Sequence, residues 1–177
     1  MAEFPDILHS WQNFYFMAGG AAATLIGLMF VALSLGMHLV NKVTEENFRI
    51  FAAPSIYYFV SALLICCVML VPTFTPRELA LIVLFGAVVG LIVTIPRVWK
   101  LVQAARKHQD FNFWDWLTQI IFPVLSYVLF GAGGLCLFID QWSLGIVAVW
   151  LATVLLLLAA IANTWSLVLW IIEQNRD

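Results

Sequence analysis

Long apolar runs separated by short polar breaks are the dominant pattern along this chain. Five runs reach the roughly 20 residues that a helix needs to cross a bilayer core of about 30 Å. They cover about 16–40, 52–72, 78–99, 116–139 and 143–172. The runs are continuous rather than alternating, which favours helices over barrel strands. The pattern predicts an all-α polytopic membrane protein, a bundle of five transmembrane helices in a single domain, residues 1–177.

The breaks between runs carry residues that start or end helices. Thr75, Pro76 and Glu78 have the spacing of a capping box, with proline at the first helical position, where its missing N–H does no harm. Asp140 and Gln141 divide the fourth run from the fifth.

A second pattern precedes the first run. Apolar residues recur there at helical spacing, opposite polar ones: Phe4, Ile7, Leu8, Trp11, Phe14 and Tyr15. This amphipathic pattern predicts a short interfacial helix over about 5–15, lying on the outer surface of the membrane. A lid over a lateral opening is the alternative interpretation.

The composition agrees with a membrane protein. The chain is 64% hydrophobic and 10% charged, against about half and a quarter in soluble domains, and its mean hydropathy is +1.01. These values exclude a soluble enzyme, a disordered chain and a disulfide scaffold. The net charge of −2 and the lack of a dense basic face indicate no nucleic-acid partner. The lipid bilayer is the expected partner.

Basic residues are distributed unevenly and predict an orientation. One side receives seven of the eight: Lys42, Arg49, Arg97, Lys100, Arg106, Lys107 and Arg176. The other side holds only Arg77. We therefore expect the N-terminus outside and the C-terminus in the cytoplasm. The basic segment over about 97–115 is interpreted as a topology-fixing loop. A lipid-headgroup site at Arg97, Lys100, Arg106 and Lys107 is the alternative.

The membrane interior offers little chemistry. No Asp, Glu, Lys, Arg or His lies within a run away from its ends, which disfavours proton-coupled transporters, pumps and voltage sensors. No nucleophile–base pair or metal-ligand set can be assembled from the interior residues, so we expect no enzyme, no metal and no cofactor. Cys66, Cys67 and Cys136 read as free thiols acting as small apolar residues. A disulfide from Cys66 or Cys67 to Cys136 is the alternative.

The fourth run is the least regular. Pro123 removes a backbone hydrogen bond, and Gly131, Gly133 and Gly134 are poor helix formers. A proline kink followed by a close-packing glycine patch is preferred, and a broken helix that forms a substrate site is the alternative. Candidate cavity residues are Pro123, Ser126, Tyr127, Gly131, Gly133, Gly134, Thr24, Gln119 and Asn163. We expect the Gln119 and Asn163 carboxamides to pair with each other.

Small residues at a spacing of about four form the strongest internal pattern. They are Gly19, Ala23, Gly27, Ala32 and Gly36 in the first run, and Gly86 and Gly90 in the third. Small faces let helix backbones approach closely. Packing inside the bundle is preferred, and a homo-oligomer interface is the alternative. The charge bias would make any homo-oligomer parallel.

Part of the first run has a family resemblance. Ala23-Thr24-Leu25, Gly27-Leu28 and Phe30-Val31-Ala32 resemble the first span of a family of small bacterial multi-pass membrane proteins with no assigned activity. The resemblance implies a bacterial plasma membrane. The chain is also similar in size, span number and tryptophan content to the translocator-protein (tryptophan-rich sensory) family. That assignment is rejected, because residues 41–51 lack the Trp and Pro of that family's first loop.

Two functions are therefore expected. The preferred one is a structural or regulatory helix bundle that acts through helix–helix association with itself or another membrane protein. The alternative is an oligomeric channel or permease for a neutral or weakly polar small solute.

Overall fold

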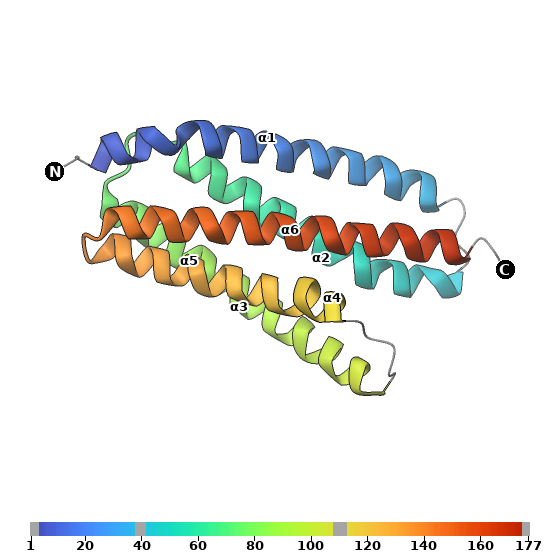
Figure 1. Cartoon of the computed structure of the whole chain (residues 1–177). Helices are drawn as coiled ribbons and strands as arrows, with labels where there is room; N and C mark the ends of the chain where they lie inside the picture. The colour runs from blue at the N-terminus through green and yellow to red at the C-terminus, as the bar shows by residue number, and fades with distance from the viewer. Residues whose placement is uncertain (1–3, 38–41, 108–112, 175–177) are drawn as a thin grey trace.

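The computed structural model describes residues 4–37, 42–107 and 113–174, and confirms an all-α helix bundle with no strand among these residues. The elements in chain order are α1 (Phe4–Met37), α2 (Lys42–Met69), α3 (Pro76–Lys107), α4 (Phe113–Trp116), the π-helical η1 (Leu117–Ile121), α5 (Phe122–Phe138) and α6 (Trp142–Gln174) (Figure 1).

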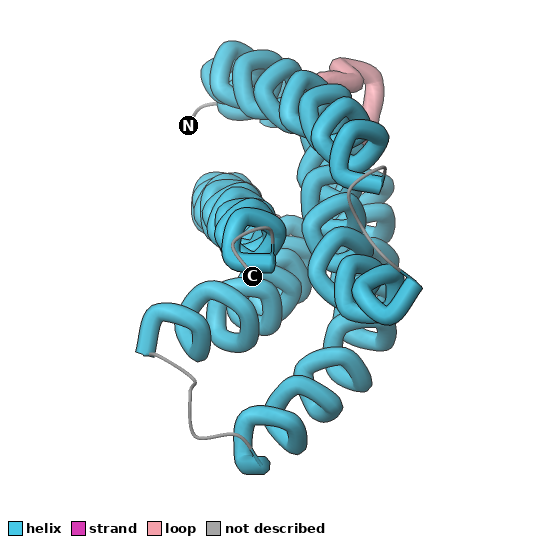
Figure 2. Tube along the Cα trace, turned by 90° about the vertical axis from the view of Figure 1, so that its right-hand side faces the viewer, coloured by secondary structure: helices cyan, strands magenta, loops and turns pink. Residues whose placement is uncertain are grey.

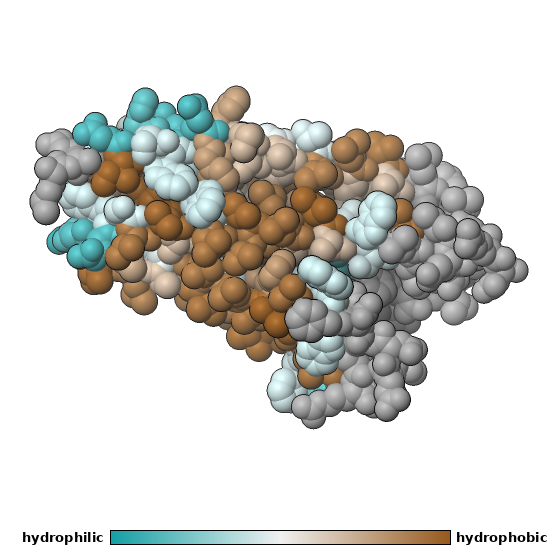
Figure 3. Space-filling view, in the orientation of Figure 1, coloured by the Kyte–Doolittle hydropathy of each residue, from teal (hydrophilic) through white to brown (hydrophobic). Residues whose placement is uncertain are grey.

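Four segments are long and apolar enough to cross a membrane, which makes this a multi-pass membrane protein. They are Phe4–Ser34, Pro76–Gln103, Leu117–Phe138 and Trp142–Ser166. The apolar part of α2, Ala53–Met69, is shorter. Figure 3 shows the matching surface, a broad hydrophobic belt with hydrophilic residues gathered at the end where α1 begins.

The helices pack in an order that differs from their order in the chain. α6 packs against α2 and α5, while α1 packs chiefly on α2 and α3 chiefly on α5. The consecutive helices α2 and α3 make few contacts. Figures 1 and 2 both show the C-terminal turns of α3 diverging from α2.

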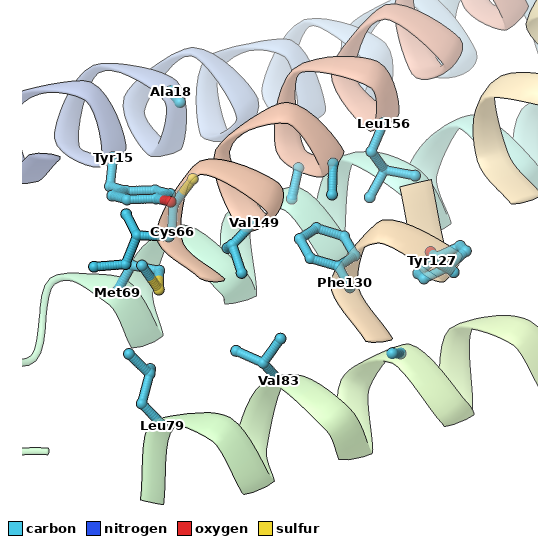
Figure 4. Close-up of a cluster of buried hydrophobic side chains, with 14 of the residues drawn as sticks. Tyr15, Ala18, Cys66, Met69, Leu79, Val83, Tyr127, Phe130, Val149 and Leu156 are labelled. Atoms are coloured by element: carbon cyan, nitrogen blue, oxygen red, sulfur yellow. The ribbon is translucent and has the colours of Figure 1, made fainter. Parts of the chain in front are cut away.

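The buried core runs along the bundle and joins all five long helices (Figure 4). Tyr15 of α1 lies over Cys66 and Met69 of α2. The central members of the cluster come from α5 and α6, and Leu79 and Val83 of α3 lie on its far side.

α1 differs from the sequence expectation, because no separate interfacial helix precedes the first span. One continuous helix runs from Phe4 to Met37. Phe4 contacts Trp142, and Trp11 contacts Trp150, each with ring centroids 5.8 Å apart. The amphipathic stretch is thus part of the bundle. The physical reason is helical phase, since the apolar face that starts at Phe4 continues in register through Ala18.

The helix ends follow their local sequence. Thr75 N–H donates to Glu78 Oε2 at 2.9 Å, and Glu78 N–H donates to Thr75 Oγ1 at 3.3 Å, which confirms the capping box. In the turn between α5 and α6, Asp140 adopts φ 62°. Its N–H and that of Gln141 bond the carbonyls of Leu137 and Cys136, which is a Schellman cap.

The irregularity predicted in the fourth run is a π-helical turn rather than a break. Phe122 N–H donates to the carbonyl of Leu117, five residues back. This wider turn comes directly before Pro123, whose ring clashes with the carbonyl one α-turn earlier and which has no N–H to give. From Phe122 onward the chain is α-helical through the glycine patch.

Candidate functional site

A group of polar side chains around Tyr127 links α2, α3 and α5 inside the bundle. The Tyr127 ring is buried and lies directly on Gly90 of α3, so closely that a Cβ at that position would overlap it. Its hydroxyl donates a 3.1 Å hydrogen bond to Ser61 Oγ of α2. The ring also lies 6.4 Å from that of Tyr57, centroid to centroid. Tyr127 therefore connects three helices.

Arg97 lies beside the same tyrosines. Its guanidinium carbon is 5.1 Å from the centroid of the Tyr57 ring, in a cation–π arrangement. Tyr58 neighbours both Arg97 and Thr94. We call Tyr57, Tyr58, Thr94 and Arg97 the tyrosine–arginine cluster.

Arg97 thus contacts α2, and the headgroup interpretation for this residue stays a prediction. The side chain turns inward because Thr94 and Arg97 are three residues apart on α3 and share the face that meets α2. The side chains of Lys100, Arg106 and Lys107 lie outside the described part of the structure.

Asn163 also joins two helices. Its Nδ2 donates a 2.7 Å hydrogen bond to Ser55 Oγ, so this buried carboxamide holds α6 to α2. Sequence reasoning paired Asn163 with Gln119 and did not indicate Ser55. Gln119 lies half-buried in the π-helical turn. Contacts of this kind stabilise helix packing in apolar surroundings.

The space beside the glycine patch, where a permease cavity was the alternative, is filled by side chains. A Cβ at Gly133 would lie 2.9 Å from Val149, and one at Gly134 would lie 2.7 Å from Leu84. Gly131 has Ala87 nearby at 3.9 Å. The patch therefore serves close packing of α5 on α6 and α3.

Two other candidate cavity residues, Ser126 and Thr24, use their hydroxyls to bond the backbone of their own helix. Ser126 donates to the carbonyl of Phe122 at 2.7 Å, one turn back on its own helix. Thr24 donates in the same way to Gly20 at 2.9 Å, and it lies exposed on α1. Thr24 is thus on the outside of the bundle.

The small residues of α1 divide between buried and exposed positions. Gly19 is buried against α2, and a Cβ built on it would lie 3.1 Å from the Cβ of Cys66. Ala23, Gly27 and Ala32 are exposed. The side-chain environment of Gly36 is outside the described part.

The outward face of α1 has a distinct composition. From Gly20 onward, the exposed residues opposite the buried face of α1 are Gly20, Thr24, Gly27, Val31 and Ser34, which we call the α1 seam. The exposed Phe16 and Met17 precede the seam on the same side of the helix. Nothing lies within 4 Å of a Cβ built at Gly20 or Gly27. Leu28 and Phe30 flank the seam on its two sides. In Figure 3 the middle of the upper edge, which α1 forms, is paler than the belt below it.

The outward face of α3 shows what a lipid-facing surface of this protein contains. Apart from Gly86, its most exposed residues are large and apolar: Leu81, Phe85, Val88, Ile92, Ile95 and Trp99. The α1 seam has two glycines, two hydroxyl residues and one valine instead. Its composition is that of a helix–helix contact rather than of a lipid contact.

Cys66, Cys67 and Cys136 are all free, so the disulfide alternative is not found. Within the described ranges, no three His, Cys, Asp or Glu side chains are grouped so that they could hold a metal ion.

The sequence indicated several of the buried polar residues but not the residues that they contact. Tyr57, Tyr58 and Ser55 were not singled out, although adjacent tyrosines in an apolar run were a signal. Comparisons with protein families, curated proteins and solved structures found no match to this chain. The resemblance in the first span therefore stays a prediction.

Proposed function

We propose that the protein is a non-catalytic membrane helix bundle that acts by assembling with a second copy of itself through the α1 seam. The observation that carries this proposal is the pair Gly20 and Gly27. Both face away from the bundle, seven residues apart, with nothing within 4 Å of a built Cβ.

The conformational cost of glycine supports a contact there. Glycine in a helix interior is about 1 kcal/mol less favourable than alanine. The bundle itself uses Gly90, Gly133 and Gly134 for close approaches. It makes no such use of Gly20 or Gly27. Unlike Gly86, which is a lone exposed glycine of α3, these two share one face with Thr24 and Ser34, which supports a contact outside the chain.

The spacing of the seam suits a symmetric partner. Its members follow one another at four, three, four and three residues, the repeat of a left-handed pair crossing at about 20°. The Thr24 hydroxyl is already bonded to its own backbone, so the seam brings little unpaired polarity into the contact. A two-fold dimer buries the same face on both copies.

Membrane orientation makes the dimer parallel. We propose that the chain lies in a bacterial plasma membrane with its N-terminus outside and its C-terminus in the cytoplasm. The seven-to-one distribution of Lys and Arg supports this. A reporter fused to the C-terminus is expected to be active only in the cytoplasm. Activity of that fusion outside the cell would overturn the orientation.

The assembly is tested by counting subunits in lipid vesicles by single-molecule photobleaching. We expect wild-type dimers, and we expect Gly27→Leu to shift the population to monomers. Gly86→Leu is the matched control, because Gly86 is an exposed glycine of α3 with nothing within 4 Å of a built Cβ. A monomeric wild type, or equal loss of dimer in both variants, would contradict the proposal. Capture of a different membrane protein would replace the second copy as the partner.

A further inference from the structure

Two buried donors on one face of α3 lack partners in the described part of the chain. They are Nη1 of Arg97 and Oγ1 of Thr94. Other helix hydroxyls here bond the carbonyl four residues back, as Thr153 does to Val149 and Thr164 does to Ala160. Thr94 does not do so, although its side chain is fully buried.

The two donors meet aromatic side chains rather than carboxylates. The guanidinium carbon of Arg97 lies 5.1 Å from the centroid of the Tyr57 ring, and the Tyr58 hydroxyl lies close enough to Thr94 to interact with its hydroxyl. The acidic side chains that the structure describes are Asp6, Glu78 and Asp140. All three lie at the end of the bundle where α1 and α3 begin, far along α3 from Arg97.

An unpaired buried charge is costly, and a ligand that pairs with it recovers that cost. A guanidinium stacked on an aromatic ring keeps its N–H edges free to bind a planar or tetrahedral oxyanion. A threonine hydroxyl one turn earlier adds a third donor on the same face. The cluster therefore has donors in excess and positive charge.

We propose that the tyrosine–arginine cluster binds a phosphate group between α2 and α3. The Arg97 guanidinium donates to the phosphate oxygens and the Thr94 hydroxyl adds a further bond. The site lies on the side of α3 that faces α2, where these two helices make few contacts.

The phosphate belongs either to a phospholipid headgroup or to a soluble anion, and the experiment separates the two. The full chain is placed in bilayer nanodiscs of phosphatidylcholine. In one arm phosphatidylglycerol is added to the bilayer, and in the other inorganic phosphate is added to the buffer. The readouts are lipid retained by native mass spectrometry and the rise in Tm that each probe produces.

Arg97→Gln is expected to weaken binding by about tenfold or more, the scale of one charge-assisted hydrogen bond. Thr94→Val is expected to weaken it less. Arg77→Gln is the control, since Arg77 is an exposed basic residue at the opposite end of α3. Unchanged binding in Arg97→Gln, or an equal loss in Arg77→Gln, would overturn the proposal. Binding by neither probe to the wild type would do so as well.

The change in Tm that Arg97→Gln causes without an added probe distinguishes a binding site from a purely structural contact. In phosphatidylcholine alone, Arg97→Gln is expected to keep or raise Tm, because it removes a half-buried charge that has no carboxylate partner among the described side chains. A purely structural cation–π contact predicts a lower Tm in that lipid and an unchanged response to both probes, which would contradict the proposal. The seam proposal is independent, so Gly27→Leu should bind the probe as the wild type does.

Discussion

Tyr15 and Tyr127 are both buried, but their hydroxyls have different surroundings. The Tyr127 hydroxyl donates to Ser61 across two helices. The Tyr15 hydroxyl has no hydrogen-bond partner among the described residues. A buried unpaired hydroxyl is unfavourable, whereas an interhelical bond is favourable by a modest amount.

The two tyrosines therefore predict opposite responses to removal of the hydroxyl. Tyr127→Phe should lower the free energy of unfolding by about 0.5–1.5 kcal/mol. Tyr15→Phe should leave it unchanged or raise it. Denaturant titration in mixed micelles measures both. An equal loss of unfolding free energy in the two variants would contradict a stabilising hydrogen bond between Tyr127 and Ser61.

Gly90 and Gly86 are one turn apart on α3, and they offer a matched test of packing. A Cβ at Gly90 would overlap the Tyr127 ring, which is buried and has no room to withdraw. Gly90→Ala should therefore destabilise the bundle by about 1–3 kcal/mol, the usual range for overpacking. Gly86→Ala should be neutral or stabilising, because its space is open. Thermal unfolding of both variants in the same detergent checks this, and equal midpoints would contradict the packing of Tyr127 on α3.

Sequence reasoning found polar residues but not their partners. Asn163 and Arg97 were both noticed, yet Ser55 and Tyr57 come from a helix that is distant in the chain. Spacing within one helix fixes which residues share a face. It does not fix which helix that face meets.

Helix phase explains both the success and the failure in predicting α1. The apolar run and its polar boundary were visible, because hydropathy alone sets them. The continuity of Phe4 to Met37 was missed. It follows from the shared phase of Phe4, Leu8 and Ala18, which lie on one face. The sequence could not show that Gly19 is buried and Gly27 exposed, because small residues at this spacing occur on inner and outer helix faces alike.

The turn between α5 and α6 gives a prediction for a helix end. Asp140 adopts φ 62°, a left-handed conformation that costs about 1–2 kcal/mol in most residues and nothing in glycine. Asp140→Val should therefore destabilise the hairpin more than Asp140→Gly by about that amount. Asp140→Gly gives up only the 3.3 Å bond from Trp142 Nε1. Unfolding midpoints for both variants test this, and a Gly variant as unstable as the Val variant would contradict the cap.

The bundle as a whole leaves α1 at one side and α3 at the other, each packed chiefly on one neighbour. α3 presents large apolar side chains to its surroundings, and α1 presents the small α1 seam. This contrast, rather than any catalytic group, distinguishes the two surfaces. It is the basis for proposing that the protein acts through association.

A cysteine scan of α1 in vesicles tests that proposal most directly. Single cysteines are placed along residues 20–31 after Cys66, Cys67 and Cys136 are replaced by alanine, and disulfide-linked dimers are measured after mild oxidation. We expect maxima at Gly20, Thr24, Gly27 and Val31, with minima at positions such as Ala22, which is buried. Dimers that form without this periodicity, maxima on another face, or no dimers at any position would contradict assembly through the α1 seam.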